Sequence, residues 1–280
     1  MRSLKLPDFT VETVFRASIE RVQDKDLKKR LEACIPEIKK DTEEYALKAS
    51  NAQLHLIKKK THVNGDVTRE ELEAVYTGRM VPKKGPGRFY YEKLRYQTDD
   101  GKCPLCAQLP VKTLDHYLAK SGYPSLALSP TNLIPACSDC NKTKNASSPS
   151  RSEEEPLHPY FDNINDSQWL FARVIQTTPA SLSFYIIPPT GASVLLAQRV
   201  TYHFELYQLN SLYSSEAASE LRNISYQMKK LYNNGGPDAV KQQLMDRAES
   251  SLHENLNSWK SAMFHALAND HWYHTTGVLF

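Results

Sequence analysis

Several features that would assign this chain to a functional class are missing from its 280 residues. No apolar run approaches the roughly 20 residues that a membrane span needs, and the start of the chain lacks the apolar core of a signal peptide. We therefore expect no membrane partner and a cytoplasmic protein. The chain also lacks a Walker motif and an internal repeat, so any nucleotide-driven step would have to come from another protein.

A strong charge of either sign is also missing. The formal net charge is +3, which is too small to indicate nucleic-acid binding unless the positive charges are concentrated in one place. The content of 40% apolar and 24% charged residues is typical of a globular protein, and the length allows two modest cores or one large one.

Cysteine is scarce, and four of the five cysteines stand in two C-x-x-C pairs. The pairs are Cys103 with Cys106 and Cys137 with Cys140. Four thiolates are the ligand set of a closed tetrahedral zinc site, so the spacing predicts a structural Zn²⁺ rather than a catalytic one. The fifth, Cys34, lies in a helical pattern, where a buried free thiol is favoured over a disulfide or a nucleophile.

The segment between the two pairs, residues 107–136, is longer than the roughly 15 to 20 residues of an ordinary zinc ribbon. It contains the dipeptide Asp115-His116, and Asn141 follows the second pair at the start of a predicted helix. Asp and Asn oxygens are hard ligands suited to Mg²⁺ or Mn²⁺, and a neutral His beside them can take a proton from water. A zinc site made of four cysteine thiolates requires none of these residues.

The order C-x-x-C, Asp-His, Asn-Leu, C-x-x-C-Asn-x-x-Lys resembles the HNH endonucleases, the ββα-metal finger nucleases, in their zinc-stapled form. The resemblance implies metal-dependent hydrolysis of DNA phosphodiesters, with His116 as the general base and Asp115 and Asn141 as ligands of a catalytic Mg²⁺ or Mn²⁺. It also implies that Asn132 braces the loop that aims His116 and that Lys144 lies near a phosphate. Asn141 stands where the letter pattern has His, as it does in some members of the family.

An HNH protein of this length with helical flanks resembles the nuclease subunits of bacterial anti-phage systems such as Septu and Zorya. This layer of the resemblance implies an ATPase partner protein. Two alternatives stay open. One is a non-catalytic zinc module that binds nucleic acid or docks a protein, and the other, within the nuclease class, is a homing or restriction enzyme.

A basic segment precedes the first cysteine pair. Its cations, Lys83, Lys84 and Arg88 among them, outnumber its acids between residues 79 and 102, and aromatic residues are interleaved with them. In a nuclease this segment would contact the phosphate backbone. The alternative is a solvated helix face whose aromatic residues lie in the core. We favour the core for the tyrosines, and both interpretations stay open for the loop lysines.

His158 begins a His-Pro-Tyr-Phe-Asp stretch that is similar to one found after the finger in longer HNH proteins. Two placements are open for this histidine. It faces the site or the DNA, or, as we favour, it packs against aromatic residues and bonds to the backbone.

The fold class that we predict is α+β, with a zinc-stapled ββα finger between mainly helical regions. The predicted domains are a helical arm with the basic loop, the finger, and a β-hairpin with a helical domain, at residues 1–98, 99–165 and 166–280. Helical spacing covers residues 11–56 with a break near Pro36, and a capping box formed by Thr68 and Glu71 starts another helix. A further short helix is expected from Arg88 to Tyr96.

In the finger we expect strands at residues 113–118 and near 126–128, followed by a helix after Cys137. Alternating residues farther on predict a β-hairpin from 169–177 and 181–188. The helices expected beyond it cover residues 200–213, 217–232, 237–251 and 256–268, with a break at 234–236.

Overall fold

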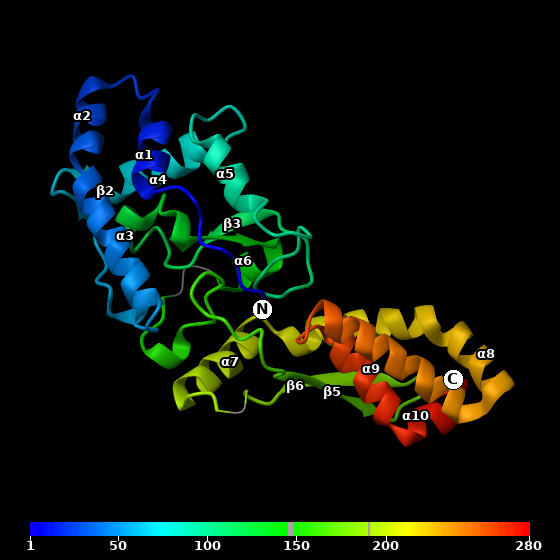
Figure 1. Ribbon diagram of the computed structural model, residues 1–280. Helices are drawn as coiled ribbons and strands as arrows, with labels where there is room; N and C mark the ends of the chain where they lie inside the picture. The colour runs from blue at the N-terminus through cyan, green and yellow to red at the C-terminus, as the bar shows by residue number, and fades with distance from the viewer. Residues whose placement is uncertain (145–147, 190) are drawn as a thin grey trace. The chain divides into compact units, whose positions relative to one another are not determined.

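The computed structural model describes residues 1–144, 148–189 and 191–280 of the chain (Figure 1). Its contacts divide the chain into two compact units, Met1–Asp162 and Asn163–Phe280. Helices and small antiparallel sheets make up both units. The predicted domain boundaries at residues 98 and 165 stay predictions. The boundary at residue 98 lies inside the first unit, and the boundary at residue 165 lies at the start of the second unit. No helix in the described ranges is both long enough and apolar enough to cross a membrane.

Three helices open the first unit where the sequence predicts a helical arm. They are α1 Val11–Ile19, α2 Lys25–Ala33 and α3 Ile35–Ala49. Side chains of Thr10 and Asp24 accept hydrogen bonds from the first-turn amides of α1 and α2, which satisfies donors that a helix start leaves unpaired. Pro36 lies in the first turn of α3, so the predicted break is confirmed.

A small hairpin, β1 His62–Val63 with β2 Val67–Thr68, follows these helices. Asn64 and Gly65 turn it with positive φ angles of 53° and 74°. The helix α4 Arg69–Val75 starts with the predicted capping box and continues into a π-helical turn, η2 Tyr76–Met80. The predicted helix of the basic segment is present as α5 Arg88–Arg95.

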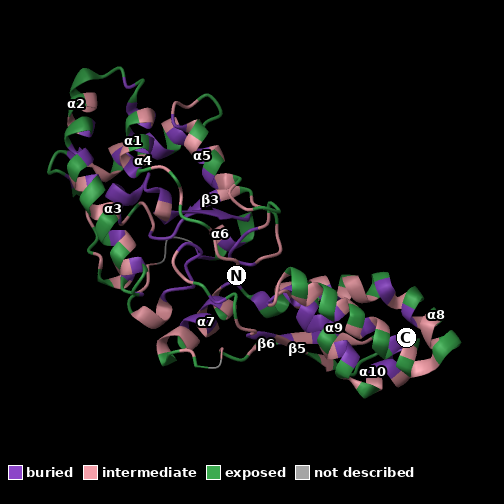
Figure 2. Cartoon of the chain, in the orientation of Figure 1, coloured by how far each residue is buried: buried purple, intermediate pink, exposed green. Residues whose placement is uncertain are grey.

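The second half of the first unit contains the cysteines and the Asp-His pair. Strand β3 Thr113–His116 pairs antiparallel with β4 Leu133–Ala136, and the helix α6 Ser138–Lys144 follows β4 directly. Figure 2 shows that this part of the chain is largely buried, and all of β3 except Thr113 lies in the interior. Residues 145–147 of the predicted loop after α6 lie outside the described residues.

The second strand of this hairpin was predicted in the wrong place. Leu126 to Leu128 do not form a strand, because Pro124 starts a 3-10 turn in which the amides of Leu126 and Ala127 bond back to Tyr123 and Pro124. These apolar residues are buried because they fill the core and not because they alternate across a sheet. The strand that pairs with β3 begins at Leu133, after Asn132.

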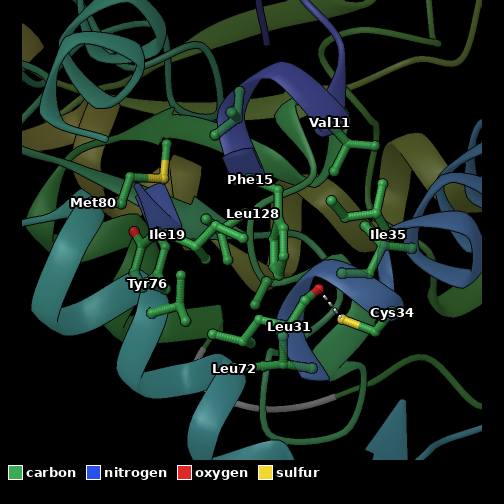
Figure 3. Packing of buried hydrophobic residues seen from close by; sticks show 14 of the residues in the cluster. Val11, Phe15, Ile19, Leu31, Cys34, Ile35, Leu72, Tyr76, Met80 and Leu128 are labelled. Atoms are coloured by element: carbon green, nitrogen blue, oxygen red, sulfur yellow. Dashed lines mark hydrogen bonds between the residues drawn. The ribbon is translucent and has the colours of Figure 1, made fainter. Parts of the chain in front are cut away.

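One hydrophobic core joins the helices of the first unit to the β3–β4 hairpin. Figure 3 shows part of this core, with Phe15, Ile19 and Leu31 among the residues labelled. Phe15, Ile19 and Leu31 of the first helices pack in the same cluster as Leu114 and Leu133 of the hairpin. Cys34 is fully buried in this cluster, and its thiol donates to the carbonyl of Leu31 at 3.0 Å. The prediction of a buried free thiol at Cys34 is therefore confirmed. The helices therefore form part of the support of the hairpin.

In the second unit, strands β5 Leu170–Ile175 and β6 Ser181–Ile186 form the predicted hairpin. Its helices are α7 Val194–Leu206, α8 Leu209–Glu254, α9 Trp259–Asn269 and α10 His271–Thr275. Gly236 has φ 67° and ψ −166° within α8, so the predicted break lies there and α8 is two helices that meet before Pro237. The helix predicted to run on to Tyr213 ends at Leu206, and Gln208, with φ 50°, separates it from α8.

Candidate metal centre and adjoining cavity

The four cysteine sulfurs of the two C-x-x-C pairs converge in the first unit. Their Sγ atoms all lie within 4.8 Å of one another, and those of Cys106 and Cys137 are 4.0 Å apart. Four sulfurs at Zn–S distances of about 2.3 Å in a tetrahedron are separated by about 3.8 Å, so these sulfurs are close enough together to bind one metal ion of this kind. Each side chain is at most 4% exposed. The cysteines could therefore bind a metal ion such as zinc.

The backbone around the first pair is shaped for such a site. Cys103 donates its amide to Leu109 at 2.8 Å and accepts from the amide of Ala107 at 2.7 Å, while Ala107 has a positive φ of 54°. The amide of Leu109 also points to the sulfur of Cys106 at 3.4 Å. In the second pair, the amide of Cys140 donates to the sulfur of Cys137 at 3.3 Å. Amide donors stabilise charge on sulfur.

The Asp-His dipeptide ends strand β3, where His116 is paired with Leu133. Nε2 of His116 lies 2.9 Å from the carbonyl oxygen of Ala127. Because a carbonyl can only accept, Nε2 carries the proton of this bond, and the neutral ring has its lone pair on Nδ1. Nδ1 forms no hydrogen bond with any described residue. Tyr76 packs its ring against His116 at 4.5 Å between centroids and 70° between planes.

The surroundings keep His116 neutral. Burial lowers the pKa of His116 to about 4, and the nearby ammonium groups of Lys144 and Lys120 act in the same direction. A histidine with this pKa is unprotonated at neutral pH. Such a neutral imidazole can act as a base, which accepts a proton, and not as a cationic acid, which donates one.

Asp115 is buried, with 5% exposure, and its Oδ2 lies 3.2 Å from the ammonium nitrogen of Lys144. Burial raises the pKa of Asp115 to about 6, and Lys144 opposes this rise by attraction and by a hydrogen bond. The ammonium of Lys144 also donates to the carbonyl of His116 at 2.6 Å. Lys144, predicted to lie near a phosphate, therefore lies in the interior and ties α6 to β3.

Asn132 lies fully buried beside the hairpin, and its side chain makes three hydrogen bonds to the backbone. Its oxygen accepts from the amide of Leu118 at 2.7 Å, and its nitrogen donates to the carbonyls of Leu118 at 3.0 Å and Leu126 at 3.1 Å. Ala127, whose carbonyl holds His116, follows Leu126 directly. Asn132 thus fixes the loop that orients His116.

A cavity of about 720 Å³ adjoins the hairpin and opens to solvent. Asp115, His116 and Asn141 all line it, so three of the predicted site residues share one cavity. Asn141 is placed there by α6, which starts directly after β4. The remaining walls come from elements on both sides of the hairpin: Glu73, Tyr76, Val81, Tyr91, Thr113, Leu114, Ala119, Lys120, Ser121, Ser138 and Lys142.

Several residues of this cavity were missed at the level of the sequence. Lys120 and Glu73 form an ion pair at 2.9 Å, and exposed Lys142 lines the same cavity. Lys142 follows Asn141 directly and could have been found from that position. Glu73 and Tyr76 carry no local signal, because the helical segment that contains them is brought to the cavity only by the tertiary fold.

The residues predicted to contact nucleic acid lie in different environments. Lys83 and Lys84 are exposed on the loop before α5 and form no ion pair within the described part of the chain. Arg88 instead binds Glu92 and the carbonyl of Val81 and lies 4.5 Å from the Tyr91 ring centroid. The guanidinium of Arg88 is therefore used in contacts within the protein.

His158 does not line the cavity and is only 1% exposed. Nδ1 accepts from the amide of Tyr160 at 3.2 Å, Nε2 bonds to the hydroxyl of Tyr45 at 2.9 Å, and the ring stacks on Tyr117 at 4.4 Å. This is the packed placement that the sequence favours. The structure leaves no ring nitrogen of His158 for a contact with nucleic acid.

The chain has a relative among known proteins that matches it over nearly its whole length. The chain is similar to protein ea31 of Escherichia phage lambda, with 27% identity over 289 residues that span 96% of this chain and 97% of that protein. No protein-family model matches the chain, and no solved structure matches it.

Proposed function

We propose that this protein is a metal-dependent HNH endonuclease that hydrolyses phosphodiester bonds of DNA. The observation that carries the proposal is the shared cavity of Asp115, His116 and Asn141, next to four converging cysteines. A zinc site by itself requires no Asp-His pair at a cavity. The order β3, β4, α6, with the Asp-His pair on the first strand and Asn141 on the helix, supports a ββα finger.

His116 is the general base in this proposal. The bond from Nε2 to Ala127 leaves the lone pair on Nδ1, where the ring takes the proton of a water molecule as that water attacks phosphorus. Tyr76 holds the ring in position, and the low pKa of His116 keeps the imidazole neutral. As the new P–O bond forms, the P–O bond to the leaving oxygen breaks, and that oxygen takes a proton from solvent. His116 then releases the proton taken from the attacking water to solvent and returns to its neutral form.

A divalent ion fits the residues that line the cavity. Asp115 and Asn141 offer hard oxygen ligands, and a set of only two protein oxygens suits a largely hydrated Mg²⁺ or Mn²⁺. When bound, this ion supplies positive charge to the scissile phosphate and the leaving oxygen. Lys142 at the same cavity adds positive charge that attracts the substrate backbone, whereas the charge of Lys120 is offset by Glu73.

Zinc has a separate role in the proposal. The Cys103, Cys106, Cys137 and Cys140 site is closed and buried, and it joins the loop after α5 to the start of α6. A structural zinc bound there would hold the start of α6, which carries Asn141, in place beside β3, which carries Asp115. The anti-phage role and the ATPase partner stay predictions that follow from the resemblance alone.

The test is cleavage of supercoiled plasmid by the purified full chain with Mg²⁺ or Mn²⁺. We expect nicked or linear products with either ion, loss of cleavage after brief EDTA treatment, and recovery when Mg²⁺ is added. Zinc content should stay near one per chain after that treatment, because four thiolates hold it tightly. A protein that keeps its zinc but cuts neither plasmid nor single-stranded DNA with either ion would be the non-catalytic zinc module instead.

A further inference from the structure

Two exposed aromatic rings lie at the ends of α5, Phe89 in its first turn and Tyr96 directly after its last residue, Arg95. Phe89 is 61% exposed and Tyr96 is 68% exposed, whereas Tyr91 and Leu94 are buried. The core placement favoured for the tyrosines is therefore wrong for Tyr96, which follows the last residue of the helix and is not covered by another segment. Positions 89, 93 and 96 follow the i, i+4, i+7 spacing of one helix face. Phe89, Lys93 and Tyr96 therefore form a single exposed row, the α5 stripe.

Cations accompany both rings of the stripe. The ammonium of Lys93 lies 5.2 Å from the ring centroid of Phe89, and the guanidinium carbon of Arg95 lies 4.2 Å from that of Tyr96. A cation on one face of an aromatic ring is a favourable arrangement that leaves a second face for another flat group. The stripe therefore offers flat apolar surfaces inside a positively charged region.

The charge around the stripe is positive on balance. Lys83 and Lys84 are exposed on the loop that leads into α5. Glu92 is held by Arg88 and Arg95, and the exposed Asp8 has an oxygen 4.0 Å from Lys93. Two more exposed acids, Asp99 and Asp100, follow Tyr96 in the chain, and Asp100 pairs with Arg2. An acidic partner is thus favoured over a basic one.

We infer that the α5 stripe binds an unpaired stretch of nucleic acid, with bases stacked on Phe89 and Tyr96 and phosphates contacting Lys83, Lys84 and Lys93. Every base has a flat face that can stack on an aromatic ring, and every phosphate attracts a cation. In a duplex the flat faces are hidden inside the base stack, so only an unpaired strand can use both rings.

The spacing of the two rings suits this partner. Seven helical rises of 1.5 Å separate positions 89 and 96 by about 10 Å, which corresponds to about three bases stacked at 3.4 Å. The inference rests on the proposed nuclease function and specifies its substrate as single-stranded or locally unpaired nucleic acid. Tyr91, on the buried side of α5, lines the cavity that contains His116, so the stripe and the proposed site share one helix.

The test is fluorescence anisotropy with a labelled oligothymidine and with a mixed-sequence duplex of equal length, using the full chain after brief EDTA treatment. Phe89→Ala and Tyr96→Ala should each weaken binding of the single strand by about five- to a hundredfold and change duplex binding by less than about twofold. A Lys83→Ala, Lys84→Ala double variant should weaken both ligands and reduce the salt dependence of both.

Tyr226→Ala is the matched control, because Tyr226 is 78% exposed in the second unit. It should bind the single strand like the unmodified protein, and Phe89→Trp should restore binding lost in Phe89→Ala. All variants change exposed side chains and should unfold at the same temperature as the unmodified protein.

The inference is overturned if Phe89→Ala and Tyr96→Ala both bind the single strand as tightly as the unmodified protein does. It is also overturned if the unmodified protein does not bind the oligonucleotide, the result expected if the stripe docks another protein instead. Plasmid cleavage separates this failure from that of the nuclease proposal. A protein that cleaves DNA but binds single strands without the stripe refutes only the stripe. A protein that binds strands through the stripe but cleaves no DNA refutes the nuclease and leaves a binding surface.

Discussion

The ammonium nitrogen of Lys144 lies 3.2 Å from Oδ2 of Asp115, and both side chains are almost completely buried. The same ammonium donates to the carbonyl of His116, so one lysine on α6 holds both residues of the Asp-His pair. Its charge offsets that of the buried carboxylate. Lys144 thus joins the helix that carries Asn141 to the strand that carries Asp115.

Replacing Lys144 by Met should therefore destabilise the first unit. The change leaves a buried carboxylate without its partner, and breaking a buried pair in this way costs roughly 3–5 kcal/mol. Lys142→Met is the control, since Lys142 is exposed and should change the stability by no more than about 0.5 kcal/mol. Urea unfolding followed by circular dichroism measures both. Equal stabilities of the two variants would show that the Lys144 pair contributes nothing.

Replacing His116 by Ala should lower the cleavage rate by about 10²- to 10⁴-fold, the usual contribution of a general base. Zinc content and DNA affinity should change little, because the imidazole acts on water, whereas the melting temperature should fall, because the ring packs on Tyr76 and its bond to Ala127 is lost. His62→Ala serves as the control, as His62 is exposed on the β1 strand. Cleavage by the His116 variant at the rate of the unmodified protein would place the base elsewhere.

Replacing Cys137 by Ser should remove the metal and destabilise the first unit by several kcal/mol, because a structural zinc contributes folding free energy directly. The matched control is Cys34→Ser, a change at a buried cysteine outside the cluster. Elemental analysis should find about one zinc per chain in the Cys34 variant and little in the Cys137 variant. A Cys137 variant with its full zinc content would exclude this residue as a ligand.

Replacing Asn132 by Ala should cost roughly 2–4 kcal/mol, because three hydrogen bonds to buried backbone groups are lost at once. Cleavage should fall as well, since the loop that carries the Ala127 carbonyl loses its support. Asn51→Ala is the comparison, because Asn51 bonds to the backbone at an exposed helix end. The expectation fails if both variants unfold at the same urea concentration.

The pair of Arg30 with Glu71 should make stability depend on pH. Bidentate hydrogen bonds from Arg30, at 2.7 and 3.0 Å, lower the pKa of Glu71 to about 2 from its ordinary 4.5. A depressed pKa means that the unfolded chain binds the proton first as the pH falls. The stabilisation by this carboxylate is therefore complete above pH 4.5 and is lost as the pH falls toward about 2.

Glu71→Gln tests this dependence. The stability difference between the unmodified protein and the variant should be largest at pH 7 and should shrink below pH 4.5. Glu43→Gln is the control, because Glu43 is exposed and has no ion pair within the described part of the chain. Urea midpoints at several pH values provide the measurement, and a difference that is constant from pH 7 to pH 3 would contradict the expectation.

Local signals in the sequence were sufficient for much of the fold. The capping box of Thr68 and Glu71, Pro36 in the first turn of α3 and the break at Gly236 all lie where the sequence predicts them. Each depends on residues within a turn or two of one another, so the neighbouring sequence carries the information. The second strand of the hairpin was misplaced because a short apolar run fits a strand and a buried turn equally well.

In the candidate site, too, some features follow from the sequence and others from the tertiary structure. The sequence alone determined the four cysteines, the Asp-His pair and Asn141, because ligand type and spacing follow directly from the order of residues. Only the tertiary structure decided that Glu73 meets Lys120, that Tyr76 packs on His116, and that Lys144 points inward to Asp115.

The placement of the aromatic residues was likewise decided by the tertiary structure, which buries His158 and Tyr91 but leaves Phe89 and Tyr96 exposed. Composition shows how apolar a segment is, and periodicity shows which of its residues share a face. Neither specifies which other segment covers that face. That choice depends on packing between residues distant in the chain, which for α5 covers the side with Tyr91 and leaves the stripe with Phe89 open to solvent.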